Sequence, residues 1–257
     1  MHYNKRDVKA ALIELGLREG DIVFSHANLS FFGIPYGGMT EDNVFSIFYD
    51  SLFEIIGDTG TWIVPTFTYS FRSNGYGEVF DYKNTPSKMG LLAEKIRGLD
   101  TSVRTLDPLF SVSICGNVNN ILKNNIISSD CFGKGSIFDL MYKKNIKFVN
   151  FNMDTATTYI HYVERELEVD YRKNILFYGK TILDNKIIDH SVFYYCRNLE
   201  SNIQAEFSKF DKLAMDRNIG RKVKLGRGSI SLITAKQTYS LIEEVLPEWK
   251  DFLIKRV

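Results

Sequence analysis

Apolar positions along this chain alternate between the spacing of an amphipathic helix and the short continuous runs of a buried strand. The first such unit predicts a helix over residues 5–16, ended by Gly16 and Gly20, and then a strand at 22–24. The same alternation continues through the first 150 residues. It predicts further helices at 44–56, 88–96 and 137–142, and further strands at 62–64, 111–115 and 146–150.

The C-terminal part of the chain contains a second group of predicted elements. Residues 230–233 predict a strand and 234–246 a helix, with Thr234 and Gln237 spaced as a capping box. Residues 171–229 combine aromatic-rich strands at 175–178 and 192–195 with a polar helix near 204–215, and could form a smaller C-terminal lobe. We therefore expect one domain over residues 1–257, an α/β fold with layers α/β/α around a central mixed sheet.

Composition and charge limit the classes of partner. The chain has 257 residues, of which 44 % are hydrophobic, enough for a substantial core. Its 32 Lys and Arg nearly balance 31 Asp and Glu, so we expect neither nucleic acid nor a membrane surface as a partner. The three cysteines are far apart, which predicts neither a disulfide framework nor a metal site. With no signal-like apolar core and no membrane-length apolar run, we expect a cytoplasmic protein.

Ligands of open α/β sheets bind where loops leave the carboxyl ends of strands. Three predicted strands end in polar segments, at residues 26–30, 65–69 and 152–161. We therefore expect the chemistry of this protein to gather at one edge of the sheet.

His161 and Glu164 lie in the last of these segments, three residues apart. On a helix this spacing puts both side chains on one face, where the carboxylate can hold one ring nitrogen while the other meets a substrate proton. This is the arrangement of an oriented general base. The same spacing also fits an ordinary surface pair.

The segments that precede His161 favour catalysis, because their order and spacing resemble the signature blocks of the aminoglycoside 3-N-acetyltransferase family. They span about two thirds of the chain. The blocks are DIVFSHANLS at 21–30, GDTGTWIVPTFT at 57–68, VFD at 79–81, TPSKMGLLAE at 85–94, RTLDPLFS at 104–111 and FGKGS at 132–136.

The resemblance implies an acetyl-CoA-dependent N-acetyltransferase that uses no metal. In this family-like arrangement His161 is the general base and Glu164 fixes its tautomer. Thr158 occupies the position of a hydroxyl that donates to the thioester oxygen as it becomes an oxyanion. The alternative for Thr158 is a bond back to its own helix.

The resemblance also implies binding residues. The coenzyme A contacts would be made largely by the backbone of Asn28, Leu29, Ser30, Ser111, Val112, Ser113, Phe132 and Gly133. Asp81 and Asp107 are candidate anchors for the substrate ammonium, with Thr68 as a further substrate contact. The alternative for each aspartate is an Asx turn within its loop.

Two departures from the family pattern put the substrate in question. Many antibiotic-modifying members have histidine in an Arg-Ser-x-His-Pro segment where this chain has Asp107. The C-terminal part also has a basic stretch, which would attract a diphosphate or would be a solvated face. This basic stretch consists of Lys209, Lys212, Arg217, Arg221, Lys222, Lys224 and Arg227.

On these grounds the sequence favours a dTDP- or UDP-linked amino sugar as the acetyl acceptor. An aminoglycoside antibiotic is the second hypothesis, and a non-catalytic coenzyme A-binding protein is the third. The sequence leaves the particular sugar, the position of its amine and the oligomeric state open.

Overall fold

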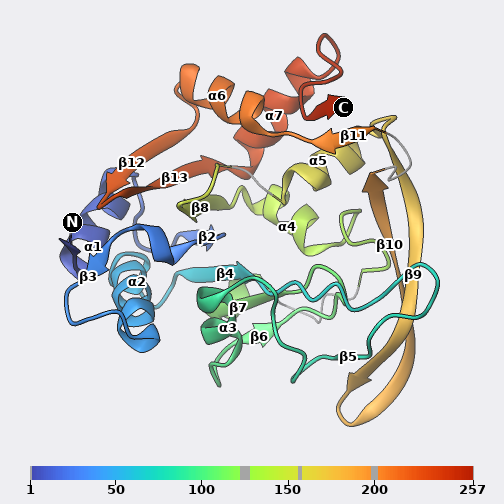
Figure 1. The fold of residues 1–257 in the computed structure, drawn as a ribbon, viewed down its shortest axis with the longest axis horizontal. Coiled ribbons are helices and arrows are strands. Elements are labelled where there is room, and N and C mark those ends of the chain that lie inside the picture. Colours follow the sequence, from blue (N-terminus) through green and yellow to red (C-terminus); the bar gives the residue numbers. More distant parts are fainter. Residues whose placement is uncertain (1, 122–127, 156–157, 198–201, 257) are drawn as a thin grey trace.

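A seven-stranded mixed sheet runs through the molecule in the order β12-β13-β8-β2-β4-β7-β6 (Figure 1). The computed structural model describes residues 2–121, 128–155, 158–197 and 202–256. The three central strands, β8 (Lys147–Phe151), β2 (Ile22–Phe24) and β4 (Thr61–Pro65), are parallel to one another. Antiparallel strands flank them, namely β13 (Gly228–Thr234) and β12 (Arg221–Leu225) on one side and β7 (Val112–Gly116) and β6 (Val103–Arg104) on the other.

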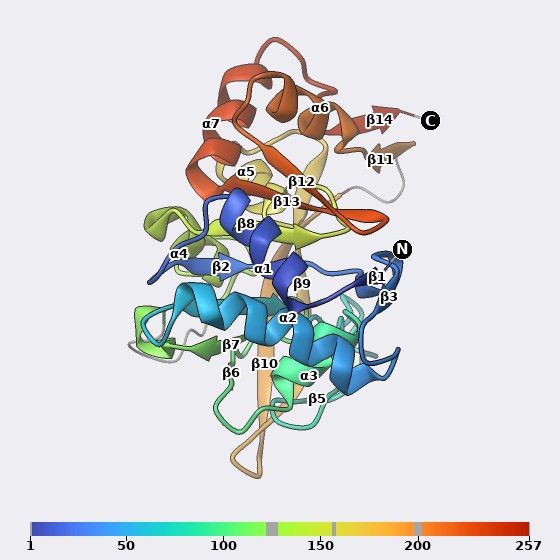
Figure 2. The same ribbon diagram turned by 90° about the vertical axis from the view of Figure 1, so that its left-hand side faces the viewer.

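Helices cover both faces of this sheet, because alternate strand residues point to opposite sides. Val23 packs in one core cluster with α1 (Lys5–Glu14), α2 (Glu41–Ile56) and α3 (Leu91–Arg97). Phe24 packs in the other cluster, with α4 (Ile137–Lys144), α5 (Ile160–Glu166), α6 (Ser208–Asp216) and α7 (Ala235–Val245). In Figure 2, α1 and α2 lie on the side that faces the viewer. The predicted α/β/α layering is confirmed.

A long hairpin stands beside this layered body (Figure 1). Its strands β9 (Arg172–Leu183) and β10 (Lys186–Arg197) pair along their whole length, and β5 (Phe80–Asp81) adds a third strand. Residues 171–229 are thus divided, because the hairpin has its own sheet while β12 joins the central one. Short pairs complete the fold, β1 (His2–Tyr3) with β3 (Ile34–Pro35) and β11 (Ile203–Ala205) with β14 (Ile254–Arg256). Two 3₁₀ turns cover Leu29–Phe31 and Val118–Asn120.

Most predicted elements agree with the structure to within a few residues. The helix predicted to start at residue 88 is an exception, since α3 begins at Leu91. Gly90 precedes it with φ of 89°, a left-handed conformation that interrupts the helix on its N-terminal side. The edge strand β12 was not predicted, because its cationic residues obscure the pattern of a strand.

The capping box of α7 offers a test of local stability. The Gln237 backbone donates to Thr234 Oγ1 at 3.4 Å, and the Thr234 backbone donates to Gln237 Oε1 at 3.0 Å. We expect Thr234→Ala to lower the free energy of unfolding by about 1 kcal/mol, because one backbone N–H loses its cap. Thr234→Ser keeps the hydroxyl and should stay near wild type in urea titrations. Equal losses in both variants would mean that packing of the threonine methyl group, not the cap, is responsible.

Candidate active site

The carboxyl ends of the three parallel strands meet at one edge of the sheet, as expected. His26 follows β2, Phe67 follows β4, and Thr158 and His161 follow β8. The His26 ring lies edge-on to Phe67 with centroids 6.0 Å apart, and its Nε2 is 3.1 Å from Thr158 Oγ1. The segments that the sequence placed at three separate strand ends therefore form one site.

His161 and Glu164 form the predicted pair on α5. Nδ1 of His161 lies 2.7 Å from Oε2 of Glu164, whose side chain is 0 % exposed, while the histidine side chain is 18 % exposed. A carboxylate only accepts hydrogen bonds, so this contact places the ring proton on Nδ1 and leaves the lone pair on Nε2. The imidazole is thus oriented as a proton acceptor.

Two residues that the sequence analysis missed complete this group. The Tyr171 hydroxyl donates to Oε1 of Glu164 at 2.9 Å. Arg172, the first residue of β9, places Nε 2.7 Å from Oε2 of Glu164 and an η nitrogen 2.9 Å from Nδ1 of His161. The chain reverses at Glu168, whose φ is 50°, and returns these side chains to α5. Only the Tyr-Arg pair at the start of an aromatic-rich strand signals them in the sequence.

The charges of these groups keep the histidine neutral. Burial lowers the pKa of His161, and the charge of Arg172 lowers it further, against the opposing effect of Glu164. Burial would raise the pKa of Glu164, but the charge of Arg172 and the hydrogen bond with His161 outweigh it, so that pKa is lowered. The site therefore holds an ionised carboxylate beside a neutral imidazole.

Thr158 lies next to His161 and contacts a second buried histidine. His26 is 5 % exposed, its backbone N–H donates to Asn150 Oδ1 at 2.9 Å, and burial lowers its pKa to about 4. It is therefore neutral near pH 7 and shares one hydrogen bond with the Thr158 hydroxyl. This contact holds Thr158 by a side chain outside its own helix.

A cavity of about 340 Å³ lies beside the 27–30 loop. The loop is held on β8 by the Asn28 N–H, which donates to the Phe151 carbonyl at 2.8 Å, and by Asn152, whose amide donates to the Asn28 carbonyl at 3.1 Å. The starts of α2 and α3 form the opposite wall. Its lining residues are Ala27, Asn28, Leu29, Ser30, Met39, Glu41, Val44, Gly90, Leu91 and Leu92. Residues 28–30, the first group of expected cofactor contacts, thus line a cavity.

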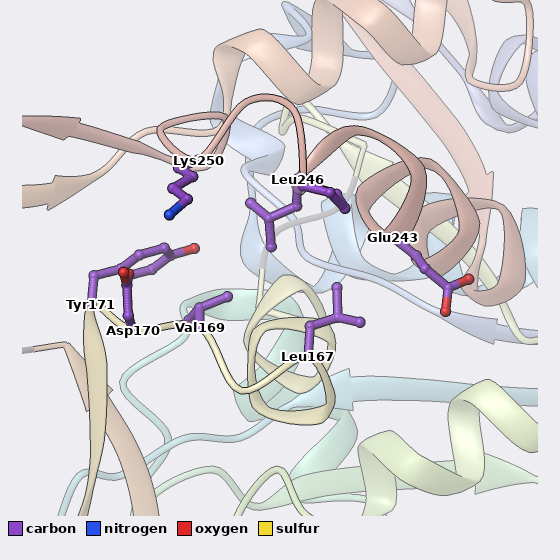
Figure 3. Close-up of a pocket in the computed structure, with 8 residues that line it drawn as sticks. Leu167, Val169, Asp170, Tyr171, Glu243, Leu246 and Lys250 are labelled. Atoms are coloured by element: carbon purple, nitrogen blue, oxygen red, sulfur yellow. The ribbon is translucent and has the colours of Figure 1, made fainter.

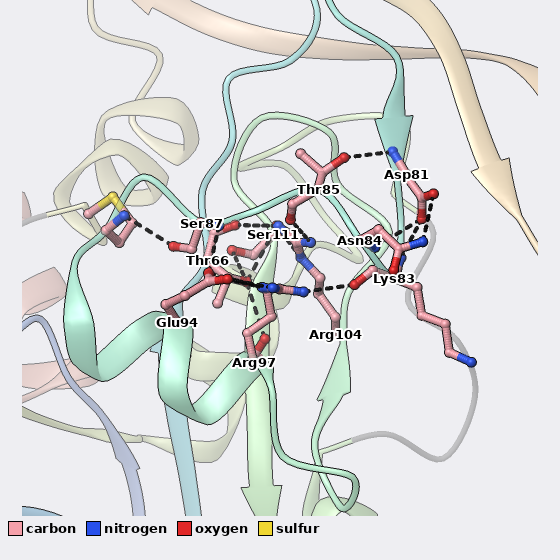
Figure 4. Close-up of polar contacts among 12 residues, drawn as sticks. Thr66, Asp81, Lys83, Asn84, Thr85, Ser87, Glu94, Arg97, Arg104 and Ser111 are labelled. Atoms are coloured by element: carbon pink, nitrogen blue, oxygen red, sulfur yellow. Dashed lines mark hydrogen bonds and ion pairs between the residues drawn. The ribbon is translucent and has the colours of Figure 1, made fainter. Parts of the chain in front are cut away.

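The second group of expected cofactor contacts, residues 111–113, is buried inside the protein. Ser111, Val112 and Ser113 are fully buried, and the Ser111 hydroxyl donates to the Thr66 carbonyl at 2.7 Å. Arg104 reaches the same Thr66 carbonyl at 2.8 Å and donates to the Ser111 hydroxyl (Figure 4). These contacts stabilise the loops around β4 and β7, so cofactor contact by residues 111–113 stays a prediction without support from exposure.

Phe132 and Gly133 lie nearer the dyad. The Phe132 ring packs edge-on against His161, with centroids 5.6 Å apart, and its backbone N–H donates to Asp130 Oδ1 at 3.0 Å. Both Phe132 and Gly133 are buried. Phe132 therefore forms one wall of the histidine environment, while cofactor binding by either residue stays a prediction.

The three expected substrate contacts all have partners within the protein. Asp107 Oδ1 accepts from the backbone N–H groups of Leu109 and Phe110 at 2.7 and 2.9 Å, and burial raises its pKa. Asp81 caps its own turn through the backbone of residues 83 and 84 (Figure 4). The hydroxyl of Thr68 donates to the Pro108 carbonyl at 2.7 Å. These geometries are those of the Asx-turn alternative for both aspartates, and an ammonium-binding role stays a prediction.

The basic stretch is divided among separate places. Lys209 donates to the carbonyls of Asp251 and Ile254, and Arg217 pairs with Glu244 at 2.9 Å. Residues 221, 222 and 224 lie exposed on β12, the edge strand of the central sheet. Charges on an edge strand deter pairing with another chain, which accounts for them without a ligand. The convergent diphosphate site that the sequence suggested is thus not supported.

Behind the dyad lies another cavity of about 340 Å³, between the loop after α5 and the end of α7 (Figure 3). Tyr171 is one of its lining residues and also contacts Glu164. The cavity is otherwise lined by Leu167, Val169, Asp170, Glu243, Leu246, Pro247 and Lys250. His161 is not part of its wall, so this space is separate from the exposed side of the imidazole.

Within residues 2–121, 128–155, 158–197 and 202–256, no three His, Cys, Asp or Glu side chains are grouped so that they could hold a metal ion. Among the helices of the same ranges, none combines the length and the apolar character that crossing a bilayer requires.

The opposing charges around His161 lead to a test by NMR titration. Glu164 raises the pKa of His161, so in Glu164→Gln the imidazole should titrate at lower pH than in wild type. The resonance is assigned by its disappearance in His161→Asn. A titration that stays in place would mean that the carboxylate does not stabilise the imidazolium.

Comparison with solved structures shows that the fold is a known one. The aminoglycoside acetyltransferase AAC(3)-Xa superposes with a TM-score of 0.80 and 19 % identity, covering 95 % of this chain and 93 % of that chain. AAC-IIIb, solved in a binary complex with CoASH, gives 0.79 and 16 %, covering 96 % and 98 %. AAC-VIa, solved with bound sisomicin, gives 0.77 and 19 %, covering 96 % and 99 %. At these identities the structures establish the shared fold.

The sequence itself shows the relationship more directly. No curated protein matches the chain. The family model described as aminoglycoside 3-N-acetyltransferase, however, matches residues 26–247, which include the 27–30 loop, Thr158 and the His161–Glu164 pair. Because this match covers most of the chain, the protein belongs to the aminoglycoside 3-N-acetyltransferase family.

Proposed function

We propose that this protein transfers the acetyl group of acetyl-CoA to a primary amine by direct attack, with His161 as the general base. The observation that carries the proposal is the 2.7 Å contact between His161 Nδ1 and a fully buried Glu164, at the strand ends where the family-like segments meet. An alkylammonium has no lone pair at neutral pH, so attack on the thioester requires a base. A neutral imidazole with a free Nε2 meets that requirement.

All bonds and protons of the acetyl transfer are accounted for. The substrate ammonium first loses one proton to solvent. As the resulting neutral amine bonds to the acetyl carbon, His161 takes a second N–H proton on Nε2 and becomes an imidazolium that Glu164 stabilises. The C–S bond then breaks, and the imidazolium returns the proton to the thiolate of coenzyme A. The Thr158 hydroxyl supports the developing oxyanion if His26 donates to Thr158 Oγ1, because the hydroxyl proton is then directed away from His26.

The cavity beside residues 27–30 is the proposed entrance for the pantetheine arm. Its walls contain the expected contacts Asn28, Leu29 and Ser30, and the loop is fixed on β8, the strand that leads into the segment of Thr158 and His161. The complex of the relative AAC-IIIb with CoASH supports coenzyme A as the co-substrate of this fold.

For the acceptor we propose an aminoglycoside in preference to a nucleotide-linked amino sugar. The basic stretch, which favoured the nucleotide, is divided between ion pairs, backbone contacts and an edge strand. An acidic pair follows β8, because Asp211 accepts a hydrogen bond from the Thr155 backbone N–H at 2.8 Å, and burial together with neighbouring Asp211 raises the pKa of Asp154. Such carboxyl groups attract a polycation and repel a diphosphate. The sisomicin complex of the relative AAC-VIa supports the same choice.

A histidine substitution tests the mechanism. His161→Asn should lower kcat by on the order of 10² to 10⁴, since general-base catalysis is lost, while coenzyme A affinity by calorimetry stays within a few-fold. The matched control is His2→Asn, on an exposed residue remote from the dyad, which should keep wild-type rates. Retention of half the wild-type kcat in His161→Asn would remove His161 from the mechanism. If wild type released no thiol from acetyl-CoA with any amine, the non-catalytic hypothesis would prevail.

A substrate panel tests the acceptor. Kanamycin, gentamicin and sisomicin are compared with dTDP- and UDP-linked amino sugars by thiol release. We expect kcat/KM for the best aminoglycoside to exceed that for every nucleotide sugar by at least about a hundredfold, which requires only about 2.7 kcal/mol of differential binding. The preference should persist when Arg221 and Lys222 on β12 are both changed to Glu. A nucleotide sugar that turns over as well as the antibiotics would restore the first hypothesis.

A further inference from the structure

Arg172 contacts both members of the dyad with one side chain. It enters from β9, outside the helix that holds His161 and Glu164, and it is 7 % exposed. Nε lies 2.7 Å from Glu164 Oε2, one η nitrogen lies 2.9 Å from His161 Nδ1, and the other donates to the Tyr195 carbonyl at 3.1 Å. A hydrogen bond to the Tyr195 carbonyl and an ion pair with Glu164 hold the guanidinium beside the ring. Because the ring proton is on Nδ1, the approach of the η nitrogen to Nδ1 is an electrostatic contact and not a hydrogen bond.

We propose that Arg172 is a positioning residue for acetyl transfer, which holds Glu164 against the imidazole and keeps His161 in its neutral, proton-accepting form. This inference rests on the proposed role of His161 as the base. It extends that role, because it assigns the state of the base to a residue on a separate structural element.

The buried carboxylate explains why such a residue is needed. Glu164 is fully buried, and an unpaired charge in such a place costs several kcal/mol. His161 alone is neutral before the reaction and cannot compensate that charge. Arg172 supplies the compensating charge, and the Tyr171 hydroxyl occupies the other carboxylate oxygen. Both oxygens of Glu164 therefore have fixed partners before any substrate arrives.

The same arginine opposes a second positive charge on the ring. When His161 takes up a proton, an η nitrogen of Arg172 is already 2.9 Å from Nδ1, so the imidazolium is stabilised by Glu164 and destabilised by Arg172. The charged groups that act on the ring are Glu164 from α5, Arg172 from β9 and Arg197 from β10, and both arginines lower the pKa of His161. Because these charges oppose one another, His161 is unprotonated before the attack and gives up its proton afterwards.

The hairpin formed by β9 and β10 holds Arg172 in this position. Arg172 donates to the carbonyl of Tyr195, and its own backbone pairs with Arg197 across the ladder between β9 and β10. The Tyr195 hydroxyl donates to the Val169 carbonyl at 2.6 Å, which fixes the turn between α5 and β9. The hairpin therefore holds the guanidinium from the side opposite to its contacts with α5.

The test is a comparison of Arg172→Met and Arg172→Lys. The methionine variant should move both the acidic limb of kcat/KM and the NMR titration of His161 to higher pH, opposite to Glu164→Gln, because a positive charge beside the ring is lost. Its kcat at pH 7 should fall about tenfold to a hundredfold from misplacement of the dyad, with KM for acetyl-CoA within a few-fold. The lysine variant keeps the charge without the planar fork, so it should keep the wild-type titration and still lose kcat.

Arg165→Gln is the matched control, because Arg165 lies on α5 beside His161 but pairs with Asp130 at 3.0 Å. It should leave the titration of His161 in place. A folded Arg172→Met with an unchanged titration, or an equal displacement in Arg165→Gln, would overturn the proposal. If the methionine variant does not fold, a lysine variant with wild-type kcat would overturn it equally. Loss of activity in His161→Asn with no effect at Arg172 would refute this inference alone, whereas an active His161→Asn would refute the proposed base.

Discussion

The active site depends on one buried charge. The carboxylate of Glu164 is removed entirely from water; Arg172 at the start of β9 compensates its charge, and His161 on α5 and Tyr171 just before β9 hold its oxygens. This requirement fixes the turn after α5 and the base of the long hairpin. Because a buried ion that loses one partner becomes strongly destabilising, the hairpin and the catalytic helix cannot move independently of each other.

The strand order of the central sheet supplies the second constraint. β8, β2 and β4 are neighbouring parallel strands at the centre of the sheet, so their carboxyl ends lie side by side at one edge. His26, Phe67 and Thr158 follow those three strands, and all of them are in contact with one another through His26. The proposed chemistry therefore lies on a short stretch of the sheet edge, although the family-like segments are spread over most of the chain.

Elements with a regular apolar period were predictable from the sequence, and so was the dyad. Burial on one or both faces imposes that period on α2, β4 and α7, and a spacing of three residues on a helix brings His161 to Glu164. Arg172 was not predictable in this way. The chain reverses its direction at Glu168 and so brings Arg172 to the dyad, and the spacing of apolar residues does not indicate such a reversal. The sequence also does not show which polar side chains already have hydrogen-bond partners within the protein. Ser111 and Asp81 have the polar character of ligand contacts, yet their partners belong to the protein.

The charge along residues 209–227 illustrates why a count of cations in the sequence does not establish a phosphate site. Seven cations within nineteen residues suggested a phosphate site, but three of them lie on an edge strand that exposes its residues on alternate sides, Lys209 donates to carbonyl groups, and Arg217 pairs with Glu244. The charges that affect substrate binding are those beside the path by which the substrate reaches Nε2 of His161. Phe207, which packs edge-on against that ring, directly precedes α6, and Asp211 lies on the first turn of the same helix. Under the proposed mechanism an ammonium-bearing acceptor must lose one proton before it reaches the thioester, and His161 removes a second as the nitrogen bonds to the acetyl carbon.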